Sequence, residues 1–264
     1  MPMLRRILAL LLPVLSVIES GSTAASASAS ALAPTGTLRV GVVRAPQAGV
    51  FFVMVDAAGR ARGVTVDLGA ALGAEIGLPV ANTVFPNSGE CTEAVATGRV
   101  DVAFMPVDPA RSARVAFGPG YYDLESTYLI SAASDIAGLA DVDRPGLRVV
   151  GIADTTTIRA SARSLHHVQP IPIRGVDEAI AMLRDGRADA LALSRDSLAQ
   201  VAPTIPGSRI LDGGFQRTSV AIAVPPGRPA ALATASAFLD RAKRDGTVRR
   251  AFDALGLTSE AVAP

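Results

Sequence analysis

The residues best suited to bind a small molecule lie in a short stretch with the order Asp108-Pro109-Ala110-Arg111. An aspartate followed by proline is a strong signal for a helix start, because the carboxylate caps the first turn and proline fits the first helical position. Arg111 then falls in that first turn, where its guanidinium can hold a carboxylate through two hydrogen bonds. An exposed arginine beside its own capping Asp108 explains the same spacing, so the stretch alone leaves both interpretations open.

Two parts of the chain repeat one pattern, which indicates two similar structural units. Residues 38–43 and 147–152 are short β-rich runs that both begin Leu-Arg-Val. Further on, residues 93–103 and 178–191 each end a helical stretch in Gly-Arg and continue as an Asp-led apolar strand. Glycine supplies the left-handed residue that ends a helix. Strands that alternate with helices predict parallel sheets covered by helices.

The first unit has the predicted order strand, helix, strand, helix, strand. Before its first helix, runs at residues 50–55 and 62–66 flank Asp-Ala-Ala-Gly, which is typical of a hairpin. The helix has Leu68, Leu72 and Ile76 on one face. The elements expected after it are a strand at 80–85, a helix from a cap at Asn87 to Thr97, and a strand from Asp101.

The last part of the chain predicts a strand at residues 219–224 and helices at 230–239 and 247–255. These helices have no sheet of their own, so they must pack on an existing lobe. We expect the chain to cross to a second lobe near residues 124–130 and to return near 219–224. The predicted division is lobe 1 at residues 34–125 plus 220–264, and lobe 2 at residues 126–219.

The N-terminus has the pattern of an export signal. Arg5 and Arg6 precede an apolar run at residues 7–18, and small residues follow it. The run is well below the roughly 20 apolar residues that a membrane-spanning helix needs. We therefore expect residues 1–33 to be a signal peptide and the mature protein to be periplasmic, with a retained anchor as the alternative. The expected cleavage positions are Ala29, Ala31 and Ala33.

Composition excludes several classes of protein. The chain has 25 Lys and Arg against 24 Asp and Glu, and this balance argues against a nucleic-acid partner. Cys91 is the single cysteine, so an internal disulfide is excluded. Adjacent His166 and His167 have no third ligand nearby in the sequence, which favours a surface position over a metal site. No motif for a cofactor is present, and we expect none.

Ligands of open α/β sheets bind beyond the carboxyl ends of strands, where loops enter helices. This rule selects the loops at residues 44–47, 86–90, 106–111 and 153–157. Asn87 and Ser88 offer polar groups there, although Asn87 also fits a helix cap, with Glu90 three residues later. Tyr121 and Tyr122 follow Gly120 and either line the cleft or fill the core beneath it.

The chain resembles the bacterial extracellular solute-binding proteins of family 3, the polar amino-acid type. The similarity spans residues 36–257, and its matching stretches are residues 63–68, 98–103, 111–122 and 230–257. It implies a fold of the periplasmic binding protein-like type II, or Venus-flytrap, class. In this class two α/β lobes with central mixed sheets are joined by two hinge strands.

The resemblance also implies roles for single residues. Arg111 would hold the carboxylate of the ligand, and Thr156 would help from the opposite lobe. The chain departs from the family where Pro106 and Asp108 replace the usual Thr or Ser. It departs again near Ser194, where family members carry the acid that binds an α-ammonium group.

An α-amino acid needs both of its charges paired, because a buried unpaired ammonium costs several kcal/mol. The acids that could replace the missing partner are Asp108, Glu125, Asp154 and, more remotely, Asp196. The first three have a simpler explanation: Asp108 and Asp154 could cap helices, and Glu125 could be a solvated hinge residue. Thr156 could likewise be only a cap or turn residue.

These observations predict a monomeric solute-binding protein rather than an enzyme. It would capture a small carboxylate-bearing solute, an amino acid or related compound, and deliver it to an ABC transporter permease. A lyase similar to cyclohexadienyl dehydratase on the same fold is one alternative, with Glu125 or Asp154 as its acid or base. A periplasmic ligand sensor is another. The sequence identifies neither the solute nor the permease.

Overall fold

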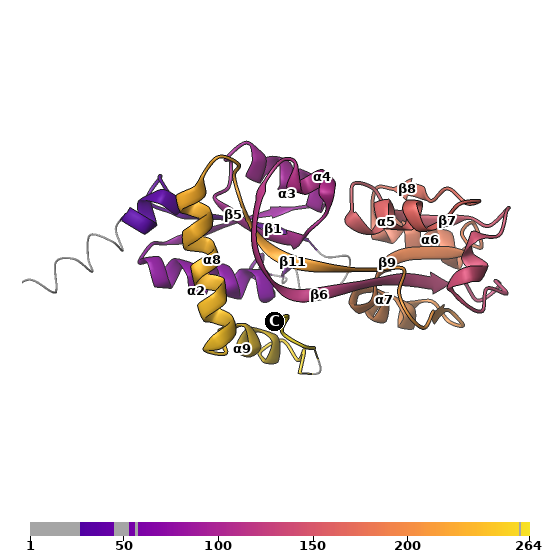
Figure 1. The fold of residues 1–264 in the computed structure, drawn as a ribbon. Helices are drawn as coiled ribbons and strands as arrows, with labels where there is room; N and C mark the ends of the chain where they lie inside the picture. The colour runs from indigo at the N-terminus through magenta and orange to yellow at the C-terminus, as the bar shows by residue number, and fades with distance from the viewer. Residues whose placement is uncertain (1–26, 45–52, 56–57, 259) are drawn as a thin grey trace, which may run out of the picture.

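Two α/β halves are joined by two long strands, β6 (Ala116–Ile130) and β11 (Gln216–Val224) (Figure 1). A computed structural model describes residues 27–44, 53–55, 58–258 and 260–264 of the chain. We call the half built around residues 34–125 and 220–264 lobe 1, and the half built from residues 126–219 lobe 2. Helices pack on a central mixed sheet in both halves, which confirms the predicted fold class.

Lobe 1 holds the first and the last elements of the chain. Its strands are β1 (Leu38–Val43), β2 (Met54–Val55), β3 (Ala61–Arg62), β4 (Val80–Phe85) and β5 (Val102–Pro106). Its helices are α2 (Val64–Ile76), α3 (Ser88–Ala96), α4 (Pro109–Ser112), α8 (Pro229–Arg244) and α9 (Thr247–Asp253).

Lobe 2 holds the middle of the chain. Its strands are β7 (Val149–Ile152), β8 (Ile171–Ile173), β9 (Ala190–Ser194) and β10 (Arg209–Ile210). Its α-helices are α5 (Thr156–Ser164), α6 (Val176–Arg184) and α7 (Arg195–Val201), and its 3-10 helices are η1 (Leu139–Asp143) and η2 (Ala202–Thr204).

Apart from β2 and β3, which pair with each other, the described strands of both lobes belong to one hydrogen-bonded sheet, although two separate sheets were expected. Among the described residues it has nine strands, with the order β4-β1-β5-β11-β6-β9-β7-β8 and β10 paired to β6. Strands β1, β4 and β5 run parallel to one another in lobe 1, and β7, β8 and β9 do so in lobe 2. The sheet is continuous because β6 and β11 are antiparallel partners that also pair with β9 and β5.

The apolar core is nevertheless divided in two. The buried clusters of lobe 1 use residues up to Leu124 and from Val220 onward. The buried clusters of lobe 2 use residues between Tyr128 and Leu211. This separation supports the proposed lobe boundaries, with β6 and β11 as the connection between the lobes.

Glycines end the repeated helices as the sequence predicted. Gly98 after α3 and Gly186 after α6 have φ values of 70° and 67°, in the left-handed region that favours glycine. Asn87 caps α3, because its Oδ1 accepts the N–H of Glu90 at 2.8 Å and its Nδ2 donates to Glu90 Oε1 at 2.9 Å. The predicted capping pair is thus confirmed.

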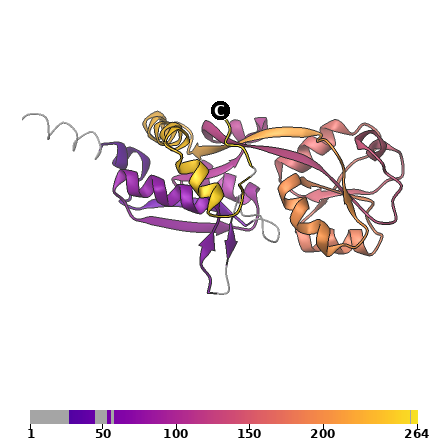
Figure 2. The ribbon, with the colours of Figure 1, turned by 90° about the horizontal axis from the view of Figure 1, so that it is seen from below.

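The hairpin of lobe 1 is present (Figure 2), although residues 50–52 of its predicted first strand lie outside the described residues. Met54 pairs with Arg62 in antiparallel register, and the described strands contain two residues each. The predicted continuation of the second strand through Val66 is wrong, because α2 begins at Val64. Gly63 turns the chain there with a φ of 151°.

The predicted signal peptide lies largely outside the described residues. Residues 27–32 form a helical turn, and Leu32 and Ala33 are buried against the core of lobe 1. Arg228 Nη2 also donates to the carbonyl oxygen of Ala31 at 2.5 Å. Cleavage after Ala33 would remove these contacts. The cleavage position stays a prediction.

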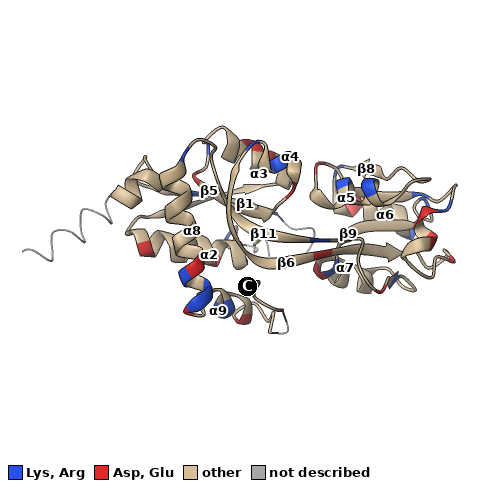
Figure 3. Cartoon of the chain, viewed as in Figure 1, with Lys and Arg blue, Asp and Glu red and all other residues tan. Residues whose placement is uncertain are grey.

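Charged residues of both signs are distributed over both lobes (Figure 3). This distribution agrees with the balance of acidic and basic residues in the whole chain. Within the described ranges, none of the helices combines the length and the apolar character needed to cross a membrane.

Candidate functional site

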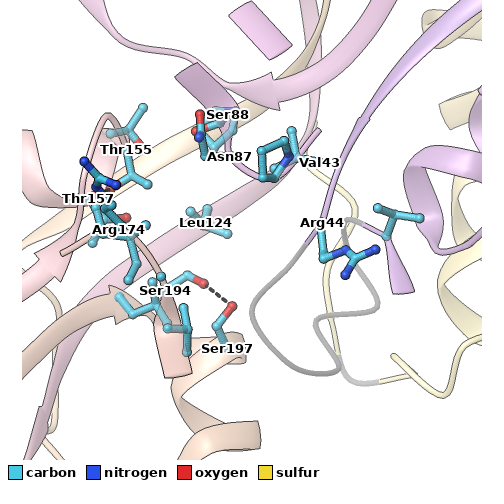
Figure 4. A pocket seen from close by; sticks show the side chains of 18 of the residues that line it. Val43, Arg44, Asn87, Ser88, Leu124, Thr155, Thr157, Arg174, Ser194 and Ser197 are labelled. Carbon is cyan, nitrogen blue, oxygen red and sulfur yellow. Dashed lines mark hydrogen bonds between the residues drawn. The ribbon is translucent and has the colours of Figure 1, made fainter. Parts of the chain in front are cut away.

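A cavity of about 550 Å³ lies between the lobes, and we call it the interlobe cavity. The carboxyl ends of β1, β4 and β5 contribute to its wall in lobe 1, and the carboxyl ends of β7, β8 and β9 with the residues that follow them contribute to its wall in lobe 2. These strand ends are where open α/β sheets bind ligands. Residues 45–47 of the first predicted loop lie outside the described residues. Leu124 of β6 lies between the two walls (Figure 4).

Three of the sequence-predicted site residues line this cavity. Asn87 and Ser88 come from the start of α3 in lobe 1, and Thr156 is the first residue of α5 in lobe 2. The cap of α5 is Thr155, whose Oγ1 accepts the N–H of Ile158 at 3.2 Å. Thr156 is therefore not the cap, and Asp154 is not the cap either.

Arg111 lies directly behind the lobe 1 wall and is only 3% exposed. Its Nη1 donates to the carbonyl oxygen of Pro106 at 2.8 Å, and its Nη2 donates to Ser88 Oγ at 2.5 Å. Both acceptor residues line the interlobe cavity. Burial lowers the pKa of Arg111 to about 10, so the guanidinium still carries its charge at neutral pH.

Asp108 uses both of its carboxylate oxygens within the protein. Oδ1 caps α4 by accepting the N–H of Arg111 at 2.9 Å, and Oδ2 accepts a hydrogen bond from Arg159 of lobe 2. Burial by itself would raise the pKa of Asp108, but these hydrogen bonds and the two guanidinium charges hold it below its usual value. Asp108 therefore forms an ion pair between the lobes and does not line the cavity.

Asp154 lies in the loop before α5, where lobe 2 contacts lobe 1. It has a φ of 59°, which is unusual for a residue other than glycine. Its carbonyl oxygen is 3.5 Å from Arg111 Nη2, and a Cβ added to Gly89 would lie 2.9 Å from the Asp154 Cβ. The Asp154 side chain does not line the cavity.

Glu125 and Tyr121 also lie away from the cavity. Glu125 on β6 pairs with Arg195 Nε and lies 3.8 Å from Arg217 Nε, so its charge is neutralised at the hinge. Tyr121 is fully buried and packs edge-on against Phe104, with 5.8 Å between ring centroids. Of the two interpretations left open for this tyrosine, the structure supports the core.

Four lining residues of lobe 2 were not predicted as a group. They are Arg174 in the loop from β8 to α6, Asp177 in the first turn of α6, Ser194 at the end of β9 and Ser197 in α7. The rule that ligands bind at the carboxyl ends of strands would have selected the residues after β8. The strand was not recognised in the sequence because Pro172 lies in its middle. Proline is tolerated there because β8 is an edge strand. Ser194 Oγ donates to Ser197 Oγ at 2.9 Å.

The remaining acidic and histidine candidates lie outside the interlobe cavity. Asp196 is in the first turn of α7, and burial raises its pKa. His166 and His167 are exposed, and Asp143 accepts their backbone N–H groups at 2.8–2.9 Å. Across the described residues, no three His, Cys, Asp or Glu side chains are grouped so as to hold a metal ion.

The model of the family described as bacterial extracellular solute-binding proteins, family 3, matches residues 41–255. Similar solved structures include a solute receptor for L-cysteine of Neisseria gonorrhoeae, with 22% identity and a TM-score of 0.75, covering 87% of this chain and 93% of that one. ArgBP from T. maritima, as a mutant, has 21% identity and a TM-score of 0.74, covering 86% and 98%.

A third similar structure is an ancestral amino acid-binding protein described as a precursor of cyclohexadienyl dehydratase. It has 26% identity and a TM-score of 0.73, and the match covers 84% of this chain and 96% of that one. No curated protein sequence matches the chain.

Proposed function

Because this chain belongs to the bacterial extracellular solute-binding proteins of family 3, we propose that it captures a small carboxylate-bearing solute in the periplasm. The solute would be an amino acid or a related compound, delivered to the permease of an ABC transporter. The proposal is supported by similar structures: solute receptors for L-cysteine, an ancestral arginine-binding protein bound to arginine or to glutamine, and a putative binding component of an ABC transporter complexed with lysine. The observation that carries it is the interlobe cavity at the strand ends of both lobes.

A carboxylate in this cavity would bind on the lobe 1 wall at Ser88, in front of Arg111. The Ser88 hydroxyl already accepts a hydrogen bond from the guanidinium, which polarises its O–H toward an anion. The charge of Arg111 stabilises the carboxylate in a site from which water is largely removed. Thr156 would contact the same group from lobe 2, across the cavity.

Binding by residues of both lobes links affinity to closure of the lobes. A ligand that contacts lobe 1 and lobe 2 together stabilises the closed arrangement over the open one. The Asp108–Arg159 ion pair joins the same two walls beside the cavity. It would therefore contribute to the closed arrangement even when the cavity holds only water.

The proposal is tested with a thermal-shift panel of amino acids, dicarboxylates and cyclic acids on the mature protein. A ligand at a hundred times its dissociation constant should stabilise the protein by about 2.7 kcal/mol. Arg111→Ala should abolish the shift, whereas Arg114→Ala should leave it unchanged. Arg114 is a matched control, since it lies just beyond α4 in a half-exposed pair with Glu93.

Loss of the buried Arg111 side chain will also lower the stability of the empty protein, so each shift is referred to the same variant without ligand. If Arg111→Ala kept the full ligand-induced shift, the carboxylate would not bind where we propose. If no compound of the panel stabilised the wild-type protein, the proposed solute class would be wrong.

The alternatives have less support from the site. A lyase needs an acid or base in the cavity, but neither Glu125 nor Asp154 lines it. A change in the mass of any stabilising compound after incubation with the protein would favour this alternative. A sensory role would be recognised by copurification with a membrane receptor in place of a permease, and sedimentation would test the expected monomer.

A further inference from the structure

The charged side chains that line the interlobe cavity are mostly positive. Among the described lining residues they are Arg44 from lobe 1 and Arg174 and Asp177 from lobe 2. Figure 4 shows Arg44 and Arg174 on opposite sides of the cavity, with Leu124 between them. Arg111 adds a further positive charge immediately behind Ser88. The cavity is thus suited to negative charge on both of its walls.

Asp177 is the single acid among the described lining residues. Asp177 is exposed in the first turn of α6 and takes part in an interaction of its own. The hydroxyl groups of Ser194 and Ser197, which are neutral, form the part of the lobe 2 wall that follows β9. An ammonium there would find hydrogen-bond acceptors but no counter-charge.

Of the other described acids considered as ammonium partners, none places its carboxylate in the cavity. Both oxygens of Asp108 accept N–H groups, and Glu125 is paired with Arg195. The carboxylates of Asp154 and Asp196 do not line the cavity. An α-ammonium group would therefore lose its hydration without gaining a carboxylate partner, which is strongly unfavourable in a closed site.

We propose that the solute is an organic dianion with two acidic groups and no ammonium group. This inference rests on the proposed function and specifies its solute class. One acidic group binds at Ser88 in front of Arg111, and the other binds toward Arg174 on the opposite wall. The apolar middle of the solute packs against Leu124 and its neighbours Ile152 and Leu193, which also line the cavity.

Calorimetric titration of the mature protein measures separately how an ammonium group and a second acidic group on the solute affect its affinity. Four five-carbon probes form one matched set: glutarate, L-glutamate, pentanoate and L-norvaline. Four eight-carbon probes form the second set: suberate, 2-aminosuberate, octanoate and 2-aminooctanoate. In at least one set we expect the dicarboxylate to bind at least tenfold more tightly than its amino derivative and than the monocarboxylate.

Variants test the position of the second acidic group. Arg174→Ala should weaken dicarboxylate binding at least tenfold and leave monocarboxylate binding unchanged. Arg184→Ala is the matched control, because Arg184 is also an exposed arginine of lobe 2 but lies at the far end of α6. Equal dicarboxylate affinities in the wild type and Arg174→Ala would overturn this assignment.

The outcomes distinguish this inference from the proposed function. If the amino acids bound and the dicarboxylates did not, the inference would be wrong and the proposed function would stand. Binding of none of the eight probes would also overturn the inference, and the Arg111→Ala experiment would then decide the proposed function alone.

Discussion

Both lobes contain the same arginine–aspartate pair at the same place in their sheets. In lobe 1 the backbone N–H, Nε and Nη2 of Arg39 donate to the carboxylate of Asp101 at 3.0, 3.0 and 2.6 Å. In lobe 2 the same three groups of Arg148 donate to Asp189 at 2.8, 3.0 and 2.8 Å. The repeated sequence pattern thus builds one local geometry twice.

The surroundings of the two pairs differ. The Asp101 side chain is fully buried, and Nη1 of a second arginine, Arg228, lies 3.8 Å from it. The Asp189 side chain is 18% exposed, and Arg148 is 45% exposed. Identical hydrogen bonds should therefore contribute different amounts to stability, because a buried charge that loses its partner cannot be rehydrated. The comparison shows that the repeated sequence spacing determines the hydrogen-bond geometry of each pair, whereas burial determines how much the pair contributes to the free energy of unfolding.

The largest effect is expected from Asp101→Asn. The change removes the charge that neutralises Arg39 and Arg228 and should lower the free energy of unfolding by about 3 kcal/mol. Urea unfolding followed by circular dichroism measures this loss. Exposed ion pairs contribute up to about 1 kcal/mol. A smaller loss than this would show that burial does not make the lobe 1 pair more stabilising than the lobe 2 pair.

Arg228→Gln should reduce the contribution of the lobe 1 pair, Arg39–Asp101, to the free energy of unfolding toward that of the lobe 2 pair. Besides its proximity to Asp101, Arg228 holds the helical turn at residues 27–32 through Ala31. Its loss should cost about 1.5 kcal/mol, typical of hydrogen bonds from a charged group. In this background Asp101→Asn should cost less than in the wild type, and the urea midpoints of the four proteins form the double-mutant cycle. Additive losses would contradict the coupling.

Much of the fold could be predicted because its signals are local. The left-handed Gly98 and Gly186, the cap at Asn87 and the strand patterns act within a few residues, so the sequence carries them directly. The shared sheet could not be predicted in the same way. It depends on the length of β6, whose 15 residues pair with β11 over one part and with β9 over the other.

The sequence predicted which loops form the site better than it predicted which side chains line the cavity. Asn87, Ser88 and Thr156 line the cavity, since strand ends determine their position. The partners of the acids depend on contacts distant in sequence, such as Arg159 to Asp108 and Arg195 to Glu125. Rules based on local sequence spacing cannot predict such distant contacts. The sequence alone therefore suggested that these carboxylates were free to bind an ammonium group.

Asp189→Asn is expected to have a smaller effect than the variants of lobe 1. The pair is partly solvated, and its removal should lower the free energy of unfolding by about 0.5–1 kcal/mol at neutral pH and low salt. Added salt should reduce the difference from the wild type, whereas the loss from Asp101→Asn should persist. Urea unfolding at two ionic strengths measures both. Equal salt dependence of the two variants would contradict the comparison.

The smallest effect is the pH dependence of the lobe 2 pair. The hydrogen bonds from Arg148 hold the pKa of Asp189 below its usual value. A carboxyl whose pKa is lower in the folded than in the unfolded protein stabilises the fold above its unfolded pKa and loses this contribution as the pH falls. The stability difference between the wild type and Asp189→Asn should therefore be full at pH 7 and shrink progressively below about pH 4. A difference that grew on acidification, followed by urea midpoints between pH 7 and pH 3, would mean that the Arg148 contact does not favour the charged carboxylate.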